Sequence, residues 1–215
     1  MITALNKKLS RDLYKIKGQL TAIILVMTAG IAIFIIMFGV LDSLRLTQST
    51  YYDRYQFADI FSSLKRAPEA VKQRINEIPG VSITQTRVVF GATLQIKNMV
   101  EPASGKIISL PDGRLPLLNN LYLRSGRFLY PNEENAVVVD ESFFIAHGFS
   151  LGDKISVIMN GYKRQLTMVG VVLSPEYVYS IAPGALMPDS KRYGLFWMSR
   201  RSLEAAVNMK GAFND

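Results

Sequence analysis

A long apolar run near the N-terminus constrains this chain more than any other feature of its sequence. Residues 20–41 read LTAIILVMTAGIAIFIIMFGVL and contain no charged side chain. As an α-helix, such a run is about 33 Å long, close to the roughly 30 Å hydrocarbon core of a bilayer. The whole chain is 49% hydrophobic and 20% charged, which is slightly too apolar for an ordinary soluble protein. We therefore predict a transmembrane helix at 20–41.

A cleaved signal peptide is the alternative for an apolar run at this position. The apolar part of a signal peptide typically spans about 7 to 15 residues and leads to a small-x-small cleavage site. This run is longer, and the sequence FGVLDSLRL at its end offers no such site. A permanent anchor is the better interpretation.

The charges on the two sides of the run predict its orientation. Bases and acids balance in residues 42–54, whereas residues 1–19 carry one acid, Asp12, against the bases Lys7, Lys8, Arg11, Lys15 and Lys17. The positive-inside rule therefore places the N-terminus in the cytoplasm. We expect a protein of the bacterial inner membrane whose residues 42–215 are extracytoplasmic.

The composition argues against nucleic-acid binding and excludes thiol chemistry. Half of the net charge of +8 lies in residues 1–19, and the remaining bases are scattered, without the basic stripe that tracks phosphates. The chain has no cysteine, so it forms no disulfide, thiolate metal site or thiol nucleophile. A cysteine-free exported domain is compatible with a bacterial cell envelope.

Helical segments are expected on both sides of the anchor. In the basic segment 1–19, apolar residues recur at helical spacing, which predicts an amphipathic helix at the cytoplasmic interface. A plain helical extension with solvated charges explains the pattern equally well. Residues 42–56 contain no Gly or Pro and predict a helical stalk with tyrosines near the headgroups. The apolar positions of the first segment and its join to the anchor are Leu5, Leu9, Leu13, Ile16 and Leu20.

Residues 57–215 are expected to form an α+β domain of strand-helix-strand units and hairpins. FADIFSSLKRAP predicts a strand, and EAVKQRINEI predicts a helix that ends at Pro79-Gly80. VSITQTRVVFGATLQIK then predicts a long strand or a bent pair broken near Gly91, which completes the first unit. Residues 98–135 are rich in Pro and Gly and predict short strands, such as KIISL and LYL, between turns. The apolar face of the helix is Val71, Ile75 and Ile78.

A second unit follows in the C-terminal half. NAVVVD predicts a buried strand, ESFFIAHG a short helix closed by Gly148, and KISVIM and RQLTMVGVVL a hairpin around Asn160-Gly161. GLFWM predicts another strand, and SRRSLEAAVNM a helix that ends near Gly211. Because no returning strand is predicted after this helix, we expect the domain to be truncated at its C-terminal side.

No enzyme motif is present. The sequence lacks G-x-x-x-x-G-K-[ST], G-x-S-x-G and H-E-x-x-H, so ATP binding by a phosphate loop is not expected. His147, the only histidine, is expected to have a structural role at a helix end rather than to bind metal. Asp140 fits a helix N-cap better than a catalytic acid. We predict no catalytic, cofactor-binding or metal-binding residue in this chain. Trp197 is expected to be a core or surface anchor. The carboxylates near Asp140 in the sequence, for which no catalytic role is expected either, are Glu133, Glu134 and Glu141.

The order of these elements resembles the permeases of ABC transporters of the macrolide-exporter, lipoprotein-release and FtsX-like type. The resemblance covers nearly the whole chain. It rests on the basic segment and single anchor, on DIFSSLKRAP, EIPGV and SGRF, and above all on NAVVVDESFFIAHGFSLGDKISV, LTMVGVV and SPEYVYSI. Permeases of this family carry such a domain between their first and second membrane helices, and three further membrane helices follow it. This chain has none of these three, so the resemblance implies an N-terminal part of a permease.

The resemblance also implies a function and partners. A cytoplasmic ABC ATPase subunit would bind and hydrolyse ATP, and the permease would couple this to extracytoplasmic domain motion and to export or release of an amphipathic substrate. The chain itself would hold no cofactor. Its other implied partners are the lipid bilayer, a second permease copy or homologue, and a periplasmic adaptor. Candidate positions for close packing against neighbouring membrane helices are Thr28, Gly30, Ala32 and Gly39.

Two other functions stay open on the sequence alone. A stand-alone single-pass envelope adaptor or sensor would have an outer part, 42–215, that folds by itself with a closed sheet. An anchored extracytoplasmic enzyme would need a pocket in which ionisable groups converge.

Overall fold

A computed structural model describes residues 4–97 and 99–215, apart from the side chain of Leu5. Residues 1–3 of the predicted basic segment, the side chain of Leu5, and residue 98 thus lie outside the described residues. The chain divides into two compact units, the first ending at Tyr51 and the second comprising Tyr52–Asp215. We describe each unit by itself.

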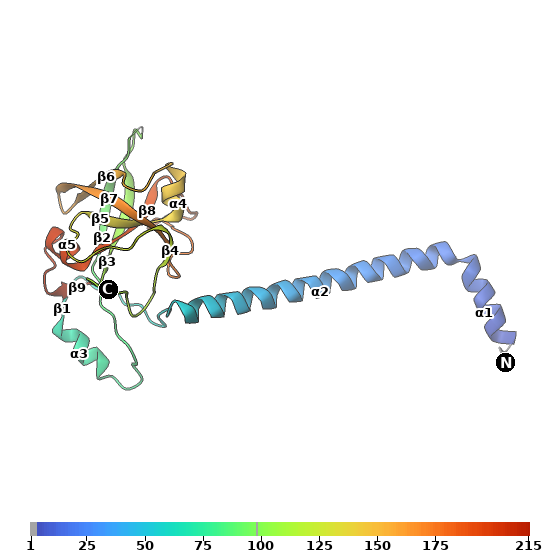
Figure 1. Ribbon diagram of the computed structural model, residues 1–215. Helices are drawn as coiled ribbons and strands as arrows, with labels where there is room; N and C mark the ends of the chain where they lie inside the picture. Colours follow the sequence, from blue (N-terminus) through green and yellow to red (C-terminus); the bar gives the residue numbers. More distant parts are fainter. Residues whose placement is uncertain (1–3, 98) are drawn as a thin grey trace. The chain divides into compact units, whose positions relative to one another are not determined.

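The first unit is helical over nearly all of its described length (Figure 1, blue). Helix α1 spans Ala4–Lys15, a turn follows at Ile16, and helix α2 spans Lys17–Arg54. The helix predicted before the anchor is therefore confirmed as a separate element. Its leucines Leu9 and Leu13 are one turn apart, so they lie on the same side of α1.

Helix α2 contains the whole apolar run and continues without a break to its last residue in the second unit. Residues 42–54 have no Gly or Pro to stop it, and the Thr47 hydroxyl donates to the Ser43 carbonyl, 2.8 Å away, one turn earlier. The division of this region into a membrane part, 20–41, and a stalk, 42–56, stays a prediction.

The second unit is built on a mixed sheet that closes on itself (Figure 1). Within the described residues, seven strands lie in the order β4-β7-β5-β8-β3-β2-β6, and β6 also pairs with β7. Strand β7 makes this closure possible because its first half pairs with β6 and its second half with β5 and β4. The strands are β2 Val89–Gln95, β3 Ala103–Leu110, β4 Tyr122–Gly126, β5 Ala136–Asp140, β6 Lys154–Met159, β7 Tyr162–Leu173 and β8 Tyr193–Ser199.

The central strands β5 and β8 are buried on both faces. Val139 and Phe196 point into one apolar cluster, whereas Val138 and Trp197 point into another on the opposite face. Such double burial explains why NAVVVD and GLFWM are continuous apolar runs rather than alternating ones. Each large apolar side chain buried in this way contributes about 1.5–3 kcal/mol.

Two short helices complete the first of these clusters. Helix α4 spans Glu141–Ala146 and contributes the fully buried Phe143, and helix α5 spans Arg200–Ala206 and contributes Leu203. The predicted α+β class is confirmed, as are the two helices that follow the buried strands.

The predicted hairpin between β6 and β7 is confirmed. Met159 and Tyr162 are cross-strand partners, with Asn160 (φ 49°) and Gly161 (φ 80°) between them. Positive φ at both central residues is the type I′ turn that matches strand twist, and Asn-Gly is its preferred sequence.

The strand predicted from FADIFSSLKRAP is wrong for most of its length. Only Ala67–Pro68 form a strand, β1, which pairs with β9, Ala212–Phe213. Residues 57–66 have the composition of a strand but no neighbouring strand to pair with, and Ile60 is 85% exposed. Strand propensity is realised only where a partner and a burying face exist.

The predicted first strand-helix-strand unit also differs from the structure. Helix α3 spans Ala70–Asn76 as expected, but none of its residues is buried, and β1 on one side of it does not pair with β2 on the other. Strand β2 begins only at Val89, and Gly91 lies inside it opposite Lys106 rather than at a break. The short strands predicted within 98–135 are β3 and β4, and β3 lies in the middle of the sheet.

The expectation that no strand returns after α5 is wrong. Gly211 adopts a positive φ of 68°, and the chain then turns back to pair along β1. Gly adopts such a conformation at the lowest cost of any residue.

Candidate functional site

Helix α2 is the first candidate functional element. Within the described residues it is the one helix long and apolar enough to cross a membrane, with a mean hydropathy of 2.8 over its most apolar window. None of its residues is buried in this chain.

The four predicted packing positions do not share one face of α2. At about 100° per residue, Thr28, Ala32 and Gly39 lie within about 40° of one another, whereas Gly30 lies on the opposite side. Side chains added at Gly30 or Gly39 would meet no atom within 4 Å. Packing of other helices at these positions stays a prediction. It would involve two different faces of α2, one with Thr28, Ala32 and Gly39 and the other with Gly30.

The first residues of the second unit are hydrogen-bonded to a loop about 60 residues further along the chain, around Asn119. We call residues 52–68 the proximal segment. The Asn119 and Asn120 amides donate to the Gln56 and Tyr55 carbonyls, both at 2.8 Å. The Ala58 amide donates to the Asn119 side-chain oxygen at 3.0 Å. Gln56 and Asn119 both have positive φ, 51° and 52°, so the two backbones turn sharply where they meet.

The closing segment, residues 212–215, lies beside the same proximal segment. Besides the β1–β9 pairing, the Leu64 amide donates to the Asn214 carbonyl at 3.0 Å, and the Ser63 hydroxyl donates to the Asp215 carboxylate at 3.2 Å. The closing segment also bonds to Arg87 and Val89. It therefore joins the proximal segment to the start of β2.

A buried cation lies at the centre of this junction. The Arg87 guanidinium, 9% exposed, pairs with Glu176 at 2.5 Å and donates from Nε to the Asp215 carboxylate at 2.8 Å. Burial alone would lower the pKa of Arg87, but the hydrogen bond and the charge of Glu176, with Asp215, raise it above its ordinary value. Arg87 is thus a permanent charge, and it links β2 to both the closing segment and the loop after β7.

The neighbouring Tyr177 is also buried. Burial, together with the negative charge of Glu176, raises the pKa of Tyr177 above its ordinary value. Its hydroxyl is therefore neutral in the folded protein at all ordinary pH values. Its ring lies 6.4 Å from that of Trp197, which is 2% exposed, so Trp197 is confirmed as a core anchor.

Asp140 is confirmed as the N-cap of α4. Its carboxylate accepts from the Ser142 amide at 3.1 Å and from the Ser180 hydroxyl at 3.4 Å. Burial raises the pKa of Asp140, while these hydrogen bonds oppose the rise. The group thus stabilises a helix start.

The carboxylates near Asp140 in the sequence do not converge on one site. Glu141 pairs with Arg124 at 3.0 Å, and Glu133 pairs with Arg127 at 2.6 Å. The hydrogen bond from Arg127 lowers the pKa of Glu133. Glu134 is exposed. These groups act as separate surface ion pairs, and the described residues contain no cluster of three or more potential metal ligands.

His147 has the structural role expected of it. It is the C-cap of α4, its ring packs 4.6 Å from that of Phe143, and its Nε2 lies 3.0 Å from the Lys191 carbonyl.

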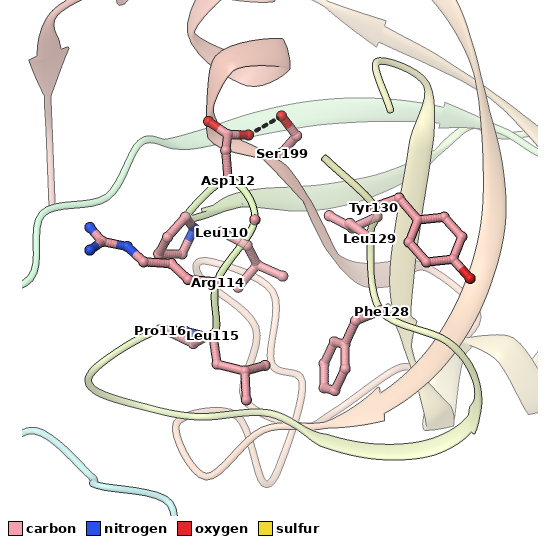
Figure 2. Close-up of a pocket in the computed structure, with 11 residues that line it drawn as sticks. Leu110, Asp112, Arg114, Leu115, Pro116, Phe128, Leu129, Tyr130 and Ser199 are labelled. Atoms are coloured by element: carbon pink, nitrogen blue, oxygen red, sulfur yellow. Dashed lines mark hydrogen bonds between the residues drawn. The ribbon is translucent and has the colours of Figure 1, made fainter. Parts of the chain in front are cut away.

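A groove lies beside the segment that follows β3. It consists of an apolar hollow of about 220 Å³ and a polar hollow of about 450 Å³, which share Pro111, Asp112 and Arg114. Figure 2 shows the apolar hollow. Its further lining includes Leu110, Leu115, Phe128, Leu129, Tyr130 and Ser199, and that of the polar hollow includes Lys72, Gln85, Thr86, Leu117 and Arg200.

Neither the groove nor the Arg87 junction was predicted from the sequence. One available signal was the single base in the strand-like, β-branched run TQTRVVF, because a charge in a buried strand must be paired. Its partners, Glu176 and Asp215, are too distant in sequence to be found by pattern.

No protein-family model and no curated protein sequence matches this chain. Among solved structures, it is similar to the extracellular domain of YknZ, a noncanonic ABC-type transporter from Gram-positive bacteria. The TM-score is 0.42 at 14% identity, over 71% of this chain and 73% of the other. The periplasmic region of MacB from Actinobacillus actinomycetemcomitans gives a TM-score of 0.40 at 15% identity, over 72% of this chain. The match spans 63% of the MacB chain, less than two thirds of it.

Proposed function

We propose that this chain is the N-terminal part of an ABC transporter permease subunit. A separate cytoplasmic ATPase would hydrolyse ATP, and the resulting movement of membrane helices would displace the extracytoplasmic domain and release an amphipathic substrate. The N-terminus would lie in the cytoplasm and residues 42–215 outside it. A second permease copy or homologue would complete the membrane part, and a periplasmic adaptor would be a further partner.

One observation carries the proposal: the apolar helix is followed, without a flexible linker, by residues that are hydrogen-bonded within the second unit. Helix α2 is unbroken to Arg54, and a helix is a stiffer spacer than a Gly-rich linker. The residues that follow are hydrogen-bonded at once, Tyr55 and Gln56 to the 119–120 loop and Leu64 to the closing segment. The closed sheet is also what a stand-alone adaptor or sensor would have, but a membrane tether needs no such connection, whereas a subunit that transmits movement does.

Purification of the natural full-length protein from its own membrane tests the proposal. We expect an ATPase subunit with a phosphate-binding loop to co-purify with it. Recovery of the protein without any ATPase would overturn the proposal in favour of the single-pass adaptor or sensor.

A distance measurement tests the coupling itself. Because the chain has no cysteine, spin labels can be attached at introduced cysteines without removing any native one. With the co-purified ATPase present, ATP and vanadate should change the distance between labels at Arg45 and Lys163. A control pair at Lys163 and Lys210, both exposed in the second unit, should not change. An unchanged first distance would contradict transmission of movement through α2.

A further inference from the structure

The groove beside the 110–117 segment has an apolar half that is open to solvent. Leu115 is 59% exposed, although Leu110 at the base of the same hollow is 8% exposed and belongs to the core. Figure 2 shows Leu115 and Phe128 on two different loops at the lower side of this hollow. Its volume of about 220 Å³ is below the roughly 300–1,000 Å³ of sites for drug-sized ligands. It therefore suits one end of a ligand, such as part of an acyl chain.

The side chains that line the adjoining polar half include more bases than acids. Lys72, Arg114 and Arg200 line it, against the single carboxylate of Asp112. That carboxylate is already engaged, because it accepts from the Ser199 hydroxyl at 2.5 Å and from the Arg201 amide at 3.2 Å. Because Arg200 is already paired with Glu69 and Glu204, the cations that would attract an anion entering this half are Lys72 and Arg114.

The three cations differ in their ion-pair partners. Arg200 is held by Glu69 and by Glu204, the latter at 2.6 Å. Within residues 4–97 and 99–215, neither Lys72 nor Arg114 takes part in any of the ion pairs found. Lys72 is half-buried on α3 and Arg114 is exposed. These two side chains are available to donate charge-assisted hydrogen bonds to an anionic group.

We propose that this groove binds a single-chain anionic amphiphile, with the acyl chain against Leu115 and Phe128 and the anionic head between Lys72 and Arg114. Charge complementarity selects the anion, and the adjoining apolar hollow selects the chain. The two hollows adjoin at the 111–114 segment, because Pro111, Asp112 and Arg114 line both, so a ligand with both a chain and a charged head would contact both halves. The proposal does not depend on the transporter function.

Photolabelling with a laurate analogue that carries a diazirine on its chain tests this site. The full chain is held in phosphatidylcholine nanodiscs, and labelled peptides are identified by mass spectrometry. We expect labelling of the peptides that contain Leu115 and Phe128, competed by laurate. Dodecyl maltoside, which has an uncharged head, and acetate, which has no chain, should compete far less. Labelling confined to α2, or equal competition by laurate and dodecyl maltoside, would overturn the proposal.

Substitutions with matched controls separate the two halves. Lys72→Gln and Arg114→Gln should each weaken laurate binding about tenfold, the usual effect of losing one charge-assisted hydrogen bond. Lys163→Gln, at an exposed base elsewhere, should leave it unchanged. Leu115→Ser should reduce labelling, whereas Leu186→Ser, at a residue that is 98% exposed outside the groove, should not. Trp197 fluorescence verifies folding of each variant, and equal labelling of groove and control variants would overturn the assignment.

A last comparison distinguishes the source of the anion. Nanodiscs that contain phosphatidylglycerol present an anionic lipid head at the bilayer, whereas free laurate is not confined to it. Competition by free laurate alone assigns the groove to a free amphiphile, as proposed. Competition by phosphatidylglycerol alone would overturn that assignment in favour of membrane lipid.

Discussion

Asn214 and Val89 exchange two hydrogen bonds: the Val89 amide donates to the Asn214 side-chain oxygen and the Asn214 side-chain amide donates to the Val89 carbonyl, both at 2.8 Å. One side chain thus acts as the partner that a neighbouring strand would supply at the start of β2. The closing segment is fixed to the sheet by this exchange and, through Leu64 and β1, to the proximal segment.

Asn214→Asp should destabilise the second unit by about 1–3 kcal/mol. The carboxylate can still accept from the Val89 amide, but it cannot donate, and it faces the Val89 carbonyl with a second acceptor. Denaturant unfolding followed by Trp197, the only tryptophan, measures the change. Asn208→Asp, at an exposed position with positive φ, is the control and should change stability little. Equal effects would mean that the exchange with Val89 contributes nothing.

Arg87→Met should destabilise the same unit by about 3–5 kcal/mol. It leaves the Glu176 and Asp215 carboxylates buried without their cation, which costs more than the pair itself contributes. Arg66→Met, at an exposed base, is the control. Adding Glu176→Gln and Asp215→Asn to Arg87→Met should restore part of the loss in the same denaturation measurement. No recovery would contradict the electrostatic origin of the effect.

Asp140 should make the second unit less stable as pH rises through its folded pKa. Burial raises that pKa, so the folded state holds the proton more tightly than the unfolded state, whose aspartate pKa is about 3.9. Below both values the carboxyl is neutral in both states. Above both, the folded state bears the cost of a buried charge.

Substitutions separate this charge effect from the capping role. Asp140→Asn keeps an acceptor for the Ser142 amide and should remove this part of the pH dependence, while Asp140→Ala should lose about 1 kcal/mol with the cap. Melting temperatures of the three proteins between about pH 3.5 and 6 test both statements. A wild type and an Asp140→Asn protein with parallel pH profiles would contradict them.

Gly39→Leu should reduce co-purification of partner subunits more than Gly30→Leu does, with equal membrane insertion. Gly39 shares its face of α2 with Thr28 and Ala32, so a bulky residue there would obstruct close approach of a neighbouring helix. Bulky replacement at either glycine should affect assembly or activity more than insertion. Recovered subunits per inserted chain is the measurement. Full recovery in both variants would mean that α2 acts only as a tether.

Glycine in the stalk should uncouple the domain. Replacing Thr47, Gln48 and Ser49 together by glycine gives a helix that is weaker by roughly 1 kcal/mol per residue than the alanine variant, which preserves the helix. We expect the ATP-dependent distance change between labels at Arg45 and Lys163 to be lost in the glycine variant and kept in the alanine variant. The same response from both would show that α2 need not be stiff.

Features that depend on neighbouring residues could be predicted from the amino-acid sequence. The uncharged run 20–41 requires a long helix, Asn160-Gly161 requires a turn, and the unbroken apolar stretch of β5 requires burial on both faces. The structural roles of Asp140 and His147 at the two ends of α4 could also be predicted, because helix capping depends on neighbouring residues. In each case the chemistry acts within a few residues of the chain.

Features that depend on distant partners emerge only when the chain is folded. Residues 57–66 have a strand-like composition, yet no strand is available to pair with them. The sheet closes because β7 is long enough to pair with β6 along its first half and with β5 along its second half. Arg87 finds its two carboxylates 89 and 128 residues away, and the groove joins Lys72 of α3 to the 110–117 loop. Such pairings depend on the closure of long loops and on which faces remain to be covered, and no local pattern encodes either.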